Sequence, residues 1–349
     1  DIEDGKREAE KNKKFDEAIK CFEKSLEINS SNYDACFNLA NVWRDLQFRN
    51  KALRYFEQAR KINPNADYIL GNVMFTKTHL CEWSKWTKDL KELSSKINNN
   101  QKVVGPFALK AMIDDPEIQL KATLIYVNDK FPKNDILPII KNHPLHKKIR
   151  IGYFSADFRD HPVSTLTVEL YERHKRGEFE VHAFSYGPDT NDDMNLRIKD
   201  GVDFFHDVRT LSTKDIVLLS RSVELDIAID LGGFTKHAKT EIFAMSAAPI
   251  QISYIGYLGS MGANYYDYLI ADKFIIPKGH QKYYSEKIIY LPSFQANDSK
   301  QSQSIKSFSR KELGLPLNGF VFCCFNNTYK INPLVFDSWT RILNQVKDS

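Results

Sequence analysis

A histidine and two aspartates follow one short apolar run, and their types suit acid–base chemistry. The segment reads SADFRDHPVS, in which His161 directly precedes Pro162 and in which Asp157 and Asp160 lie upstream. Because proline favours the first position of a helix, we expect a helix to begin at Pro162 and His161 to cap it. An imidazole there could orient or deprotonate a hydroxyl group, or bind a phosphate. The alternatives are a plain helix cap for the histidine and turn formation for the aspartates.

Two further loops display cationic side chains beyond short apolar runs. In GGFTKHAKTE, paired glycines permit close backbone approach, and Thr235, Lys236 and His237 follow them. In NNTYKIN, Lys330 precedes Pro333, where a new helix could add oriented N–H groups to the lysine charge and form a phosphate site. A simple glycine-rich turn and a solvated lysine are the respective alternatives.

Short apolar runs that alternate with amphipathic stretches position the first two of these loops. The runs predict strands at 149–154, 179–186, 226–231, 250–254 and 268–271, and the stretches predict helices at 164–175, 192–200, 213–222 and 240–246. Such alternation indicates a mostly parallel sheet that is covered by helices on both faces. Ligands bind these sheets outside the carboxyl ends of the strands, which is where both loops would lie.

The third loop belongs to a separate region near the end of the sequence. A stretch rich in Ser, Gln and Lys predicts a linker over 293–310, and GFVFCCF then predicts a new strand. We therefore expect one α/β lobe over 148–292 and the first strand and helix of a second lobe over 311–349. Two lobes facing a shared cleft are the layout of nucleotide-sugar transferases. Because the second lobe is so short and the sequence starts without Met, we expect a longer parent protein.

The first 80 residues repeat with a period of 34 residues, which is the spacing of tetratricopeptide repeats. Small, aromatic, small and terminating residues recur in that order: Ala18, Phe22, Ser25 and Ser30, then Ala52, Phe56, Ala59 and Pro64. We expect an α-solenoid of these repeats over 1–80. The pattern decays where Trp86 replaces the expected small residue, so we assign 81–147 to a helical cap or transition segment.

Two asparagines also stand 34 residues apart, at Asn38 and Asn72, on the first helix of successive repeats. That helix lines the concave face of a solenoid. A side-chain amide there could hydrogen-bond an extended peptide backbone whatever its side chains are. The alternative is a hydrogen bond to the neighbouring repeat.

The composition excludes several classes of partner and site. Lys and Arg number 49 against 45 Asp and Glu, and a net charge of +4 with interspersed signs is too weak to favour a nucleic-acid groove. No apolar run approaches the roughly 18 residues of a membrane span, so we expect a soluble, cytoplasmic protein with no membrane partner. The five cysteines include no C-x-x-C pair, and no carboxylate cluster indicates a metal site.

Five ordered motifs, together with the repeat period, resemble the O-linked N-acetylglucosamine transferase family, glycosyltransferase family 41, of the bacterial type with tetratricopeptide repeats. The motifs are GYFSADFRDHPVS, DLGGFTK, FAMSAAPIQISYIGYLGSMGANYYDYLIAD, YYSEKIIYLP and FCCFNNTYKINP. The resemblance implies a GT-B catalytic region with Rossmann-like lobes. It also implies inverting transfer of N-acetylglucosamine from UDP-N-acetylglucosamine to Ser or Thr of proteins, with no required metal or other cofactor.

The resemblance further implies roles for residues at the sheet edge. His161 matches the active-site histidine of the family and Asp157 matches a nearby aspartate, and both positions have been proposed as the general base. Lys330 matches the lysine that contacts the donor diphosphate. This sequence has Asp160 where the family usually has asparagine before the histidine.

The same resemblance implies a set of donor-binding residues. Lys330 and Lys236 match cleft lysines, and Ile255 and Gly256 match backbone contacts to the sugar. Asn327 stands where animal members have glutamine, a longer amide with the same donor and acceptor groups. The set is completed by two neighbours of these motifs, Thr235 and Pro162.

Other functions remain open on the sequence. A transferase of the same fold could use GDP-fucose, as in the plant SPINDLY branch, or could glycosylate asparagine. A non-catalytic repeat scaffold that only binds proteins is a further alternative, although it has no physical need for three polar groups at strand ends. We expect the repeat groove to bind protein acceptors, and we expect the 349 residues by themselves to be inactive because half of the cleft would be missing.

Overall fold

The computed structural model describes residues 2–140 and 146–349, and it describes side chains of the first helix from residue 13 onward. These residues fold into two compact units. Asp1–Asp114 and Ser304–Ser349 form one, here called the repeat unit, and Asp115–Gln303 form the other, the sheet unit. The segment 81–147, predicted as one transition segment, is divided between the two units, and its residues 141–145 lie outside the described residues.

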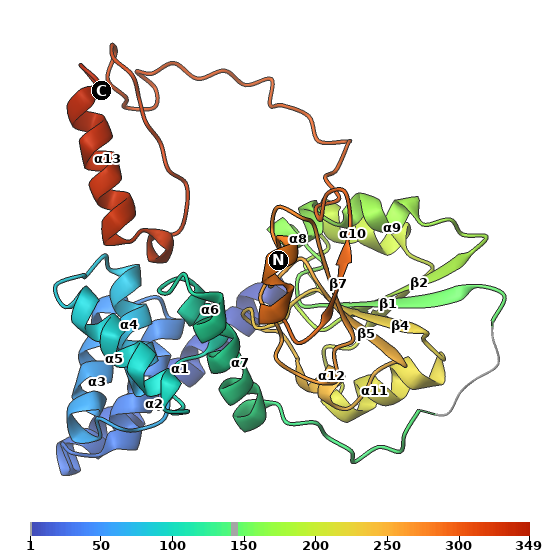
Figure 1. Ribbon diagram of the computed structural model, residues 1–349, viewed down its shortest axis with the longest axis horizontal. Coiled ribbons are helices and arrows are strands. Elements are labelled where there is room, and N and C mark those ends of the chain that lie inside the picture. Colours follow the sequence, from blue (N-terminus) through green and yellow to red (C-terminus); the bar gives the residue numbers. More distant parts are fainter. Residues whose placement is uncertain (1, 141–145) are drawn as a thin grey trace. The chain divides into compact units, whose positions relative to one another are not determined.

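Helices in chain order make up the first part of the repeat unit (Figure 1). They are α1 (Ile2–Ile28), α2 (Tyr33–Asp45), α3 (Arg49–Ile62), α4 (Ile69–His79), α5 (Trp86–Asn98) and α6 (Pro106–Lys110). Each helix from α1 to α4 contacts the next one along the chain, and α6 contacts α4. This is the arrangement of stacked helical pairs that the 34-residue period predicts.

Small side chains allow these helices to approach one another closely. Ala40 on α2 and Ala52 and Ala59 on α3 are fully buried, and Phe56 fills the space between them. At the start of α2, the side chain of Asn32 accepts a hydrogen bond from the backbone N–H of Ala35 at 3.1 Å, so a polar cap fixes where this helix begins.

The sheet unit begins with α7 (Pro116–Lys130) and is built on one parallel sheet in the order β3-β2-β1-β4-β5-β6-β7 (Figure 1). Its strands are β1 (Ile149–Ser155), β2 (Phe179–Ser185), β3 (Phe204–Asp207), β4 (Ile227–Asp230), β5 (Ile250–Tyr254), β6 (Tyr268–Ala271) and β7 (Lys287–Tyr290). All six neighbouring pairs are parallel. The chain runs outward from β1 to β3 and then returns to β4 on the other side of β1, so the order reverses between β1 and β4.

Two hydrophobic cores cover the two faces of this sheet. Consecutive residues of a strand point to opposite faces. On β1, Phe154 packs in one core with Phe184 and Phe243, whereas Tyr153 packs in the other with Tyr171. Besides α7, the helices of this unit are α8 (Pro162–Thr165), α9 (Val168–Arg173), α10 (Asp193–Gly201), α11 (Thr213–Ser222), α12 (Glu241–Ala244) and the 3₁₀ helix η1 (Lys278–Tyr283). Burial on both faces explains why the strands read as nearly continuous apolar runs.

The five predicted strands correspond to β1, β2, β4, β5 and β6. The sequence did not predict β3 or β7, which have four residues each and lie at the two edges of the sheet. On β3 the burial pattern is mixed, with Phe204 at 49% exposure, so the apolar run that marks a buried strand is absent.

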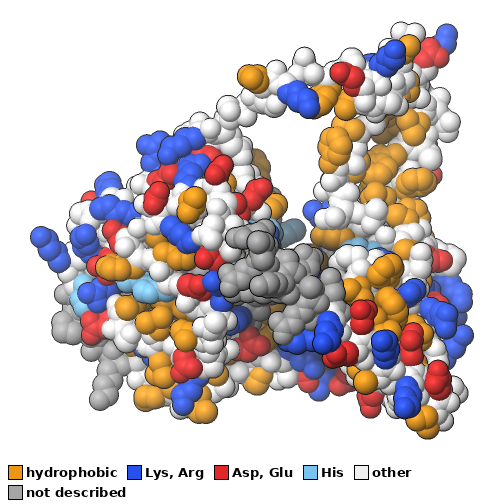
Figure 2. Space-filling view, turned by 180° about the vertical axis from the view of Figure 1, so that it is seen from behind, with side chains coloured by type: hydrophobic (Ala, Val, Ile, Leu, Met, Phe, Trp, Pro, Cys, Tyr) orange, Lys and Arg blue, Asp and Glu red, His pale blue; other side chains and the backbone are white. Residues whose placement is uncertain are grey.

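The end of the chain differs from its prediction. Residues 319–325, GFVFCCF, form no strand, and Phe320, Phe322 and Phe325 are exposed. A strand is held by hydrogen bonds to a neighbouring strand, and no described residue supplies one here. The predicted helix is observed as α13 (Pro333–Gln345), where Asn332 accepts a hydrogen bond from the backbone N–H of Val335 at 3.0 Å. Apolar side chains gather over this helix (Figure 2).

The predicted linker over 293–310 contains no helix or strand, but its first part is anchored to the sheet unit. Asp298 forms an ion pair with Arg197 at 2.7 Å. Ser299 donates a hydrogen bond from its hydroxyl group to Glu169 at 2.8 Å. Lys300 also forms an ion pair with Glu172 at 2.9 Å, so residues 298–300 are bound to the sheet unit.

The described residues contain neither a membrane-spanning helix nor a cluster of metal ligands. No helix among residues 2–140 and 146–349 is long and apolar enough to cross a membrane. Within the same ranges, no three His, Cys, Asp or Glu side chains lie close enough together to hold a metal ion.

Candidate functional site

Two of the predicted loops lie next to each other at the carboxyl edge of the sheet. The His161 loop follows β1 and the GGFTK loop follows β4, and these strands are neighbours at the point where the strand order reverses. Crevices outside such a reversal point are where open α/β sheets bind ligands. The topology therefore brings these two groups of candidate residues together.

His161 caps the short helix α8, as the sequence predicts. Its ring atom Nδ1 accepts a hydrogen bond from the backbone N–H of Val163 at 3.3 Å. An imidazole nitrogen that accepts a hydrogen bond carries no proton, so the neutral ring holds its proton on Nε2. In this arrangement His161 offers an N–H donor, and Nε2 has no free lone pair with which to deprotonate a hydroxyl group.

The electrostatic surroundings keep this ring neutral near pH 7. Partial burial lowers the pKa of His161, and the negative charge of Asp157 opposes that effect. The Asp157 carboxylate is largely buried, with Oδ2 at 3.7 Å from Nδ1 of His161 and Oδ1 at 3.3 Å from the guanidinium group of Arg159. Asp157 therefore lies beside the imidazole without a hydrogen bond to it, because Nδ1 already accepts from Val163.

Hydrogen bonds between side chains and the backbone hold the His161 loop in place. The hydroxyl group of Ser155 accepts from the backbone N–H of Asp157 at 2.9 Å, and the hydroxyl group of Ser164 donates to the Asp157 carbonyl oxygen. Asp160 is exposed, and its backbone N–H donates to Asp192 at 3.0 Å. The loop is thus tied to the strand before it, to α8 after it and to the cap of α10.

In the GGFTK loop the glycines are tightly packed, whereas the lysine side chain is exposed. Gly233 has a φ of +58°, and a Cβ atom there would lie 2.5 Å from Cβ of Tyr257, so no other residue fits. The hydroxyl group of Thr235 donates to the carbonyl oxygen of Gly232 at 2.7 Å. Lys236 is exposed beyond this turn, where its ammonium group can reach an anionic ligand.

Ile255 and Gly256 form a strained turn directly after β5. Ile255 has a φ of +59°, and the backbone N–H of Gly256 donates to the carbonyl oxygen of Tyr254 at 2.8 Å across it. A β-branched residue in this region costs about 1–3 kcal/mol, and such strain concentrates at functional sites. A Cβ atom on Gly256 would lie 2.0 Å from the carbonyl oxygen of Leu231, so this turn packs directly on the end of β4.

The third predicted loop lies in the repeat unit rather than in the sheet unit. Lys330 ends the 3₁₀ helix η2 (Thr328–Lys330), and Asn327 directly precedes it without a capping hydrogen bond from its side chain. Both side chains are exposed, and Nζ of Lys330 lies 3.5 Å from Oδ1 of Asn326. Because Lys330 and His161 belong to different units, the shared cleft stays a prediction.

An aromatic contact that the sequence did not predict holds the Lys330 loop. The ring of Tyr329 lies 5.5 Å from Phe75, 4.9 Å from His79 and 6.0 Å from Phe107, measured between ring centroids. The hydroxyl group of Thr328 also donates to the carbonyl oxygen of His79 at 2.9 Å. Contacts between residues 250 positions apart carry no local sequence signal, which is why this one was missed.

The two asparagines of the repeats differ in what they contact. Oδ1 of Asn72 accepts from the guanidinium group of Arg44 at 2.8 Å, and its Nδ2 donates to the carbonyl oxygen of Tyr68 at 3.0 Å. Asn72 thus makes the bond to a neighbouring repeat that was the alternative to peptide binding. Asn38 is exposed on α2, and its role in acceptor binding stays a prediction.

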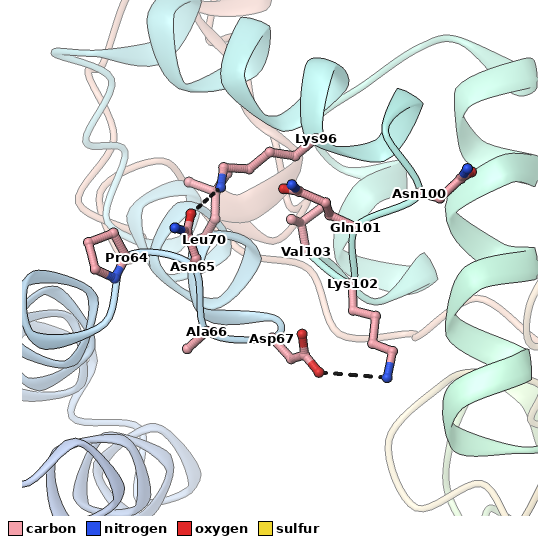
Figure 3. A pocket seen from close by; sticks show the side chains of 10 residues that line it. All are labelled: Pro64, Asn65, Ala66, Asp67, Leu70, Lys96, Asn100, Gln101, Lys102 and Val103. Carbon is pink, nitrogen blue, oxygen red and sulfur yellow. Dashed lines mark hydrogen bonds and ion pairs between the residues drawn. The ribbon is translucent and has the colours of Figure 1, made fainter.

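A cavity of about 320 Å³ in the repeat unit contains none of the predicted site residues (Figure 3). The loop before α4 and the segment after α5 line it. Lys96 donates to Asn65 at 3.0 Å, and Lys102 forms an ion pair with Asp67 at 3.7 Å. Since both lysines already have partners on the cavity wall, the cavity offers no clear anion site.

Comparisons with known proteins agree with this architecture. The family model for Glycosyl transferase family 41 matches residues 137–305 and 293–349, and tetratricopeptide repeat models match residues 7–32 and 33–66. The fold is similar to that of a mutant of the Thermobaculum terrenum O-GlcNAc transferase, with a TM-score of 0.67 and 22% identity over 94% of this chain and 62% of that chain.

Three relatives are similar to this chain over only a small part of their own length. A probable UDP-N-acetylglucosamine–peptide N-acetylglucosaminyltransferase SEC from Arabidopsis thaliana is 34% identical over 79% of this chain and 30% of its own. The corresponding transferase of Caenorhabditis elegans is 34% identical over 42% of this chain and 13% of its own. A rice protein named SPINDLY is 31% identical over 57% of this chain and 22% of its own length. The chain therefore spans less than a third of each of these relatives.

Proposed function

Because this chain belongs to glycosyl transferase family 41, we propose that it is part of a protein O-GlcNAc transferase. The enzyme would transfer N-acetylglucosamine from UDP-N-acetylglucosamine to Ser or Thr hydroxyl groups of proteins, with inversion at the anomeric carbon. A cytoplasmic location belongs to the same proposal.

One observation carries the proposal. The family match over residues 137–349 spans His161, Lys236 and Lys330 together, and it follows directly on a helical repeat region suited to binding proteins. The printed names of the relatives describe peptide N-acetylglucosaminyltransferases, which agrees with a sugar nucleotide as donor and a protein as acceptor.

The proposed reaction is an in-line displacement. The acceptor oxygen forms a bond to the anomeric carbon while the bond from that carbon to the diphosphate oxygen breaks, and UDP leaves with the bonding electrons. The Lys330 ammonium group would stabilise the negative charge that develops on the diphosphate. The hydroxyl proton of the acceptor passes to a base.

The geometry of the cap favours a positioning role for His161 over a base role. With Nδ1 bonded to the Val163 N–H, the proton on Nε2 can donate to an oxygen of the donor or acceptor. Deprotonation by His161 would require the ring to lose this bond and change tautomer. Asp157, a largely buried carboxylate beside the ring, is the alternative base.

The repeat unit would supply the acceptor site. Stacked helical pairs form an extended concave surface, and Asn38 is exposed on one of its helices. Acceptor proteins would bind along this groove and present a hydroxyl group to the sheet unit, so the repeats would control which proteins are modified. Neither nucleic acid nor a membrane is expected as a partner.

The test is intact mass spectrometry of acceptor proteins incubated with the full-length parent protein. UDP-N-acetylglucosamine and GDP-fucose are supplied in parallel reactions, and a Lys330→Ala variant is the control. We expect a mass increment of one N-acetylhexosamine with the UDP sugar alone, which the variant loses. A deoxyhexose increment would instead assign the protein to fucosyl transfer, and no increment with either donor would favour a binding scaffold.

A further inference from the structure

Asp230, the last residue of β4, is a buried carboxylate that holds the GGFTK loop. It is 1% exposed, and its Oδ1 accepts the backbone N–H groups of Gly232 at 2.9 Å and Gly233 at 3.1 Å. Its Oδ2 accepts the hydroxyl group of Tyr266 at 2.5 Å. Burial raises the pKa of Asp230, and these three donors oppose that effect by favouring the charged form.

A second buried carboxylate holds the loop that follows Gly256. Glu286 is 4% exposed, its Oε1 accepts the backbone N–H of Met261 at 2.6 Å and its Oε2 accepts the hydroxyl group of Ser260 at 2.9 Å. Ser260 accepts in turn from the backbone N–H of Gly262 at 3.0 Å. Burial raises the pKa of Glu286 as well.

The two loops pack into one block, here called the paired loops, comprising residues 230–236 and 255–262. A Cβ atom on Gly233 would lie 2.5 Å from Cβ of Tyr257 and 3.3 Å from Sδ of Met261. On the other side, Gly256 lies so close to the carbonyl oxygen of Leu231 that only a residue without a Cβ atom fits there. Neither loop can shift without displacing the other.

We propose that Asp230 and Glu286 are positioning residues that fix the paired loops for binding of the sugar nucleotide. The inference rests on the proposed function and on the family resemblance, which implies that Thr235, Lys236 and the Ile255–Gly256 turn contact the donor. Neither carboxylate needs to contact the donor. Asp230 accepts two backbone N–H groups of its loop and Glu286 accepts one N–H and one hydroxyl group, so each sets where its loop meets the ligand.

A carboxylate suits this task better than an amide of the same shape. Every group that faces Asp230 is a donor, and a carboxylate has only acceptors. In Asp230→Asn, one of the two positions becomes an NH₂ group. This group either faces the glycine N–H groups or makes the Tyr266 hydroxyl accept a hydrogen bond instead of donating one. The same conflict arises in Glu286→Gln, so both substitutions keep the side-chain volume and disturb only the hydrogen bonds.

The test measures the donor KM and kcat of both variants in the full-length parent protein, with a fixed acceptor peptide and varied UDP-N-acetylglucosamine. The matched control is Asp226→Asn, since Asp226 lies just before the other end of β4 and accepts the backbone N–H of Arg150 at 2.8 Å. We expect donor KM to rise about tenfold in each variant with kcat changed less than about twofold, because uniform binding is lost. The control should keep the donor KM of the wild type.

A purely structural role would give a different result. Destabilised enzyme loses active molecules, which lowers apparent kcat at unchanged KM. Tyr266→Phe removes one of the three hydrogen bonds to Asp230 and should raise donor KM in the same direction by a smaller factor. This milder variant keeps the inference testable if Asp230→Asn fails to fold.

Amide hydrogen exchange supplies a readout that does not depend on catalysis. The N–H groups of Gly232, Gly233 and Met261 should exchange about tenfold faster in the matching variant, while the β1 amides keep their rates. Unchanged exchange, or faster exchange with unchanged donor KM, would overturn the inference in an active parent. A wild-type parent that transfers no sugar would instead refute the proposed function, whatever the exchange rates are.

Discussion

The paired loops and the Lys330 loop are both candidate donor contacts, but they are held in different ways. In the paired loops, Asp230 and Glu286 bond the backbone directly from within the same unit, and both carboxylates are buried. In residues 326–332 the polar side chains are mostly exposed, and the ring of Tyr329 makes the long-range contacts. The paired loops are thus held from within the sheet unit, whereas the Lys330 loop depends on packing against helices that are distant in the sequence.

This difference separates two kinds of contribution to binding. A loop fixed by buried hydrogen bonds loses little entropy when a ligand binds, which favours affinity. An exposed lysine beside an aromatic anchor can adjust, and its charge matters most where negative charge develops. We therefore expect the paired loops to control donor affinity and Lys330 to control turnover.

The largest expected effect belongs to Lys330. In the full-length parent, Lys330→Ala should lower kcat by about 10²–10³, the size observed when one group that stabilises developing charge is removed. Affinity for a short acceptor peptide should not change. The control is Lys347→Ala, which removes an exposed lysine after α13. Steady-state kinetics checks the prediction, and equal turnover in the two variants would exclude Lys330 from the mechanism.

Gly256→Ala tests the rigidity of the paired loops. The new methyl group would lie 2.0 Å from the carbonyl oxygen of Leu231, so backbone must move, and overpacking of this kind costs about 1–3 kcal/mol. The control is Gly279→Ala, because no atom lies within 4 Å of a Cβ atom there. Denaturant unfolding of both variants measures the difference in the free energy of unfolding. Equal stability would show that the loops adapt, and the comparison with the Lys330 loop would fail.

Acid should release the anchored end of the linker. Hydrogen bonds from the backbone N–H of Ser299, then from Arg173 and the hydroxyl group of Ser299, lower the pKa of Glu169 from 4.5 to about 2. A carboxylate whose pKa is lower in the folded protein contributes stability above its unfolded pKa, and that contribution is lost as the pH falls from about 4.5 to about 2. Glu169→Gln removes the titrating group and should flatten this part of the pH dependence.

Denaturant unfolding at several pH values between 5 and 2 checks this prediction for the wild type and the variant. Glu178→Gln, which replaces an exposed glutamate in the same unit, is the control and should keep the wild-type slope. Identical slopes for the wild type and Glu169→Gln would mean that the linker is not held by this carboxylate.

The sheet unit was more predictable from sequence than the rest of the chain. Central strands such as β1 are buried on both faces, so their apolar runs are unmistakable, and Pro162 after His161 marks a helix start by local chemistry alone. The edge strands β3 and β7 lack that pattern. GFVFCCF has a strand composition, yet it forms none, because strand formation depends on a partner that composition does not reveal.

The sequence predicted the exposed residues of the candidate site but not the buried carboxylates that hold its loops. His161, Lys236 and Lys330 stand out because each is a polar group in a loop after an apolar run. Asp230 was overlooked although it lies near the end of the predicted run 226–231, two residues before the first of two glycines, a local signal that could have found it. Glu286 had no comparable signal, since its partners are about 25 residues away in the sequence.

The same distinction between side chains used by the fold and side chains left for a ligand recurs in the repeats. Asn72 bonds Arg44 and the Tyr68 carbonyl oxygen, whereas Asn38 is exposed. Asn72→Ala should lower the free energy of unfolding by about 0.5–1.5 kcal/mol, because it removes hydrogen bonds at a partly buried site. Asn38→Ala should change it by less than about 0.5 kcal/mol, as exposed positions usually do.

Acceptor kinetics then decide which asparagine serves the groove. In the full-length parent, Asn38→Ala should raise KM for a protein acceptor more than for a short peptide, because only the longer chain reaches along the repeats. Asn72→Ala should leave the ratio of the two KM values unchanged, since its amide is already bonded to a neighbouring helix. If Asn72→Ala raises that ratio without loss of stability, then the Arg44 bond opens to admit the acceptor. The repeats would in that case resemble the adjustable Lys330 loop rather than the fixed paired loops.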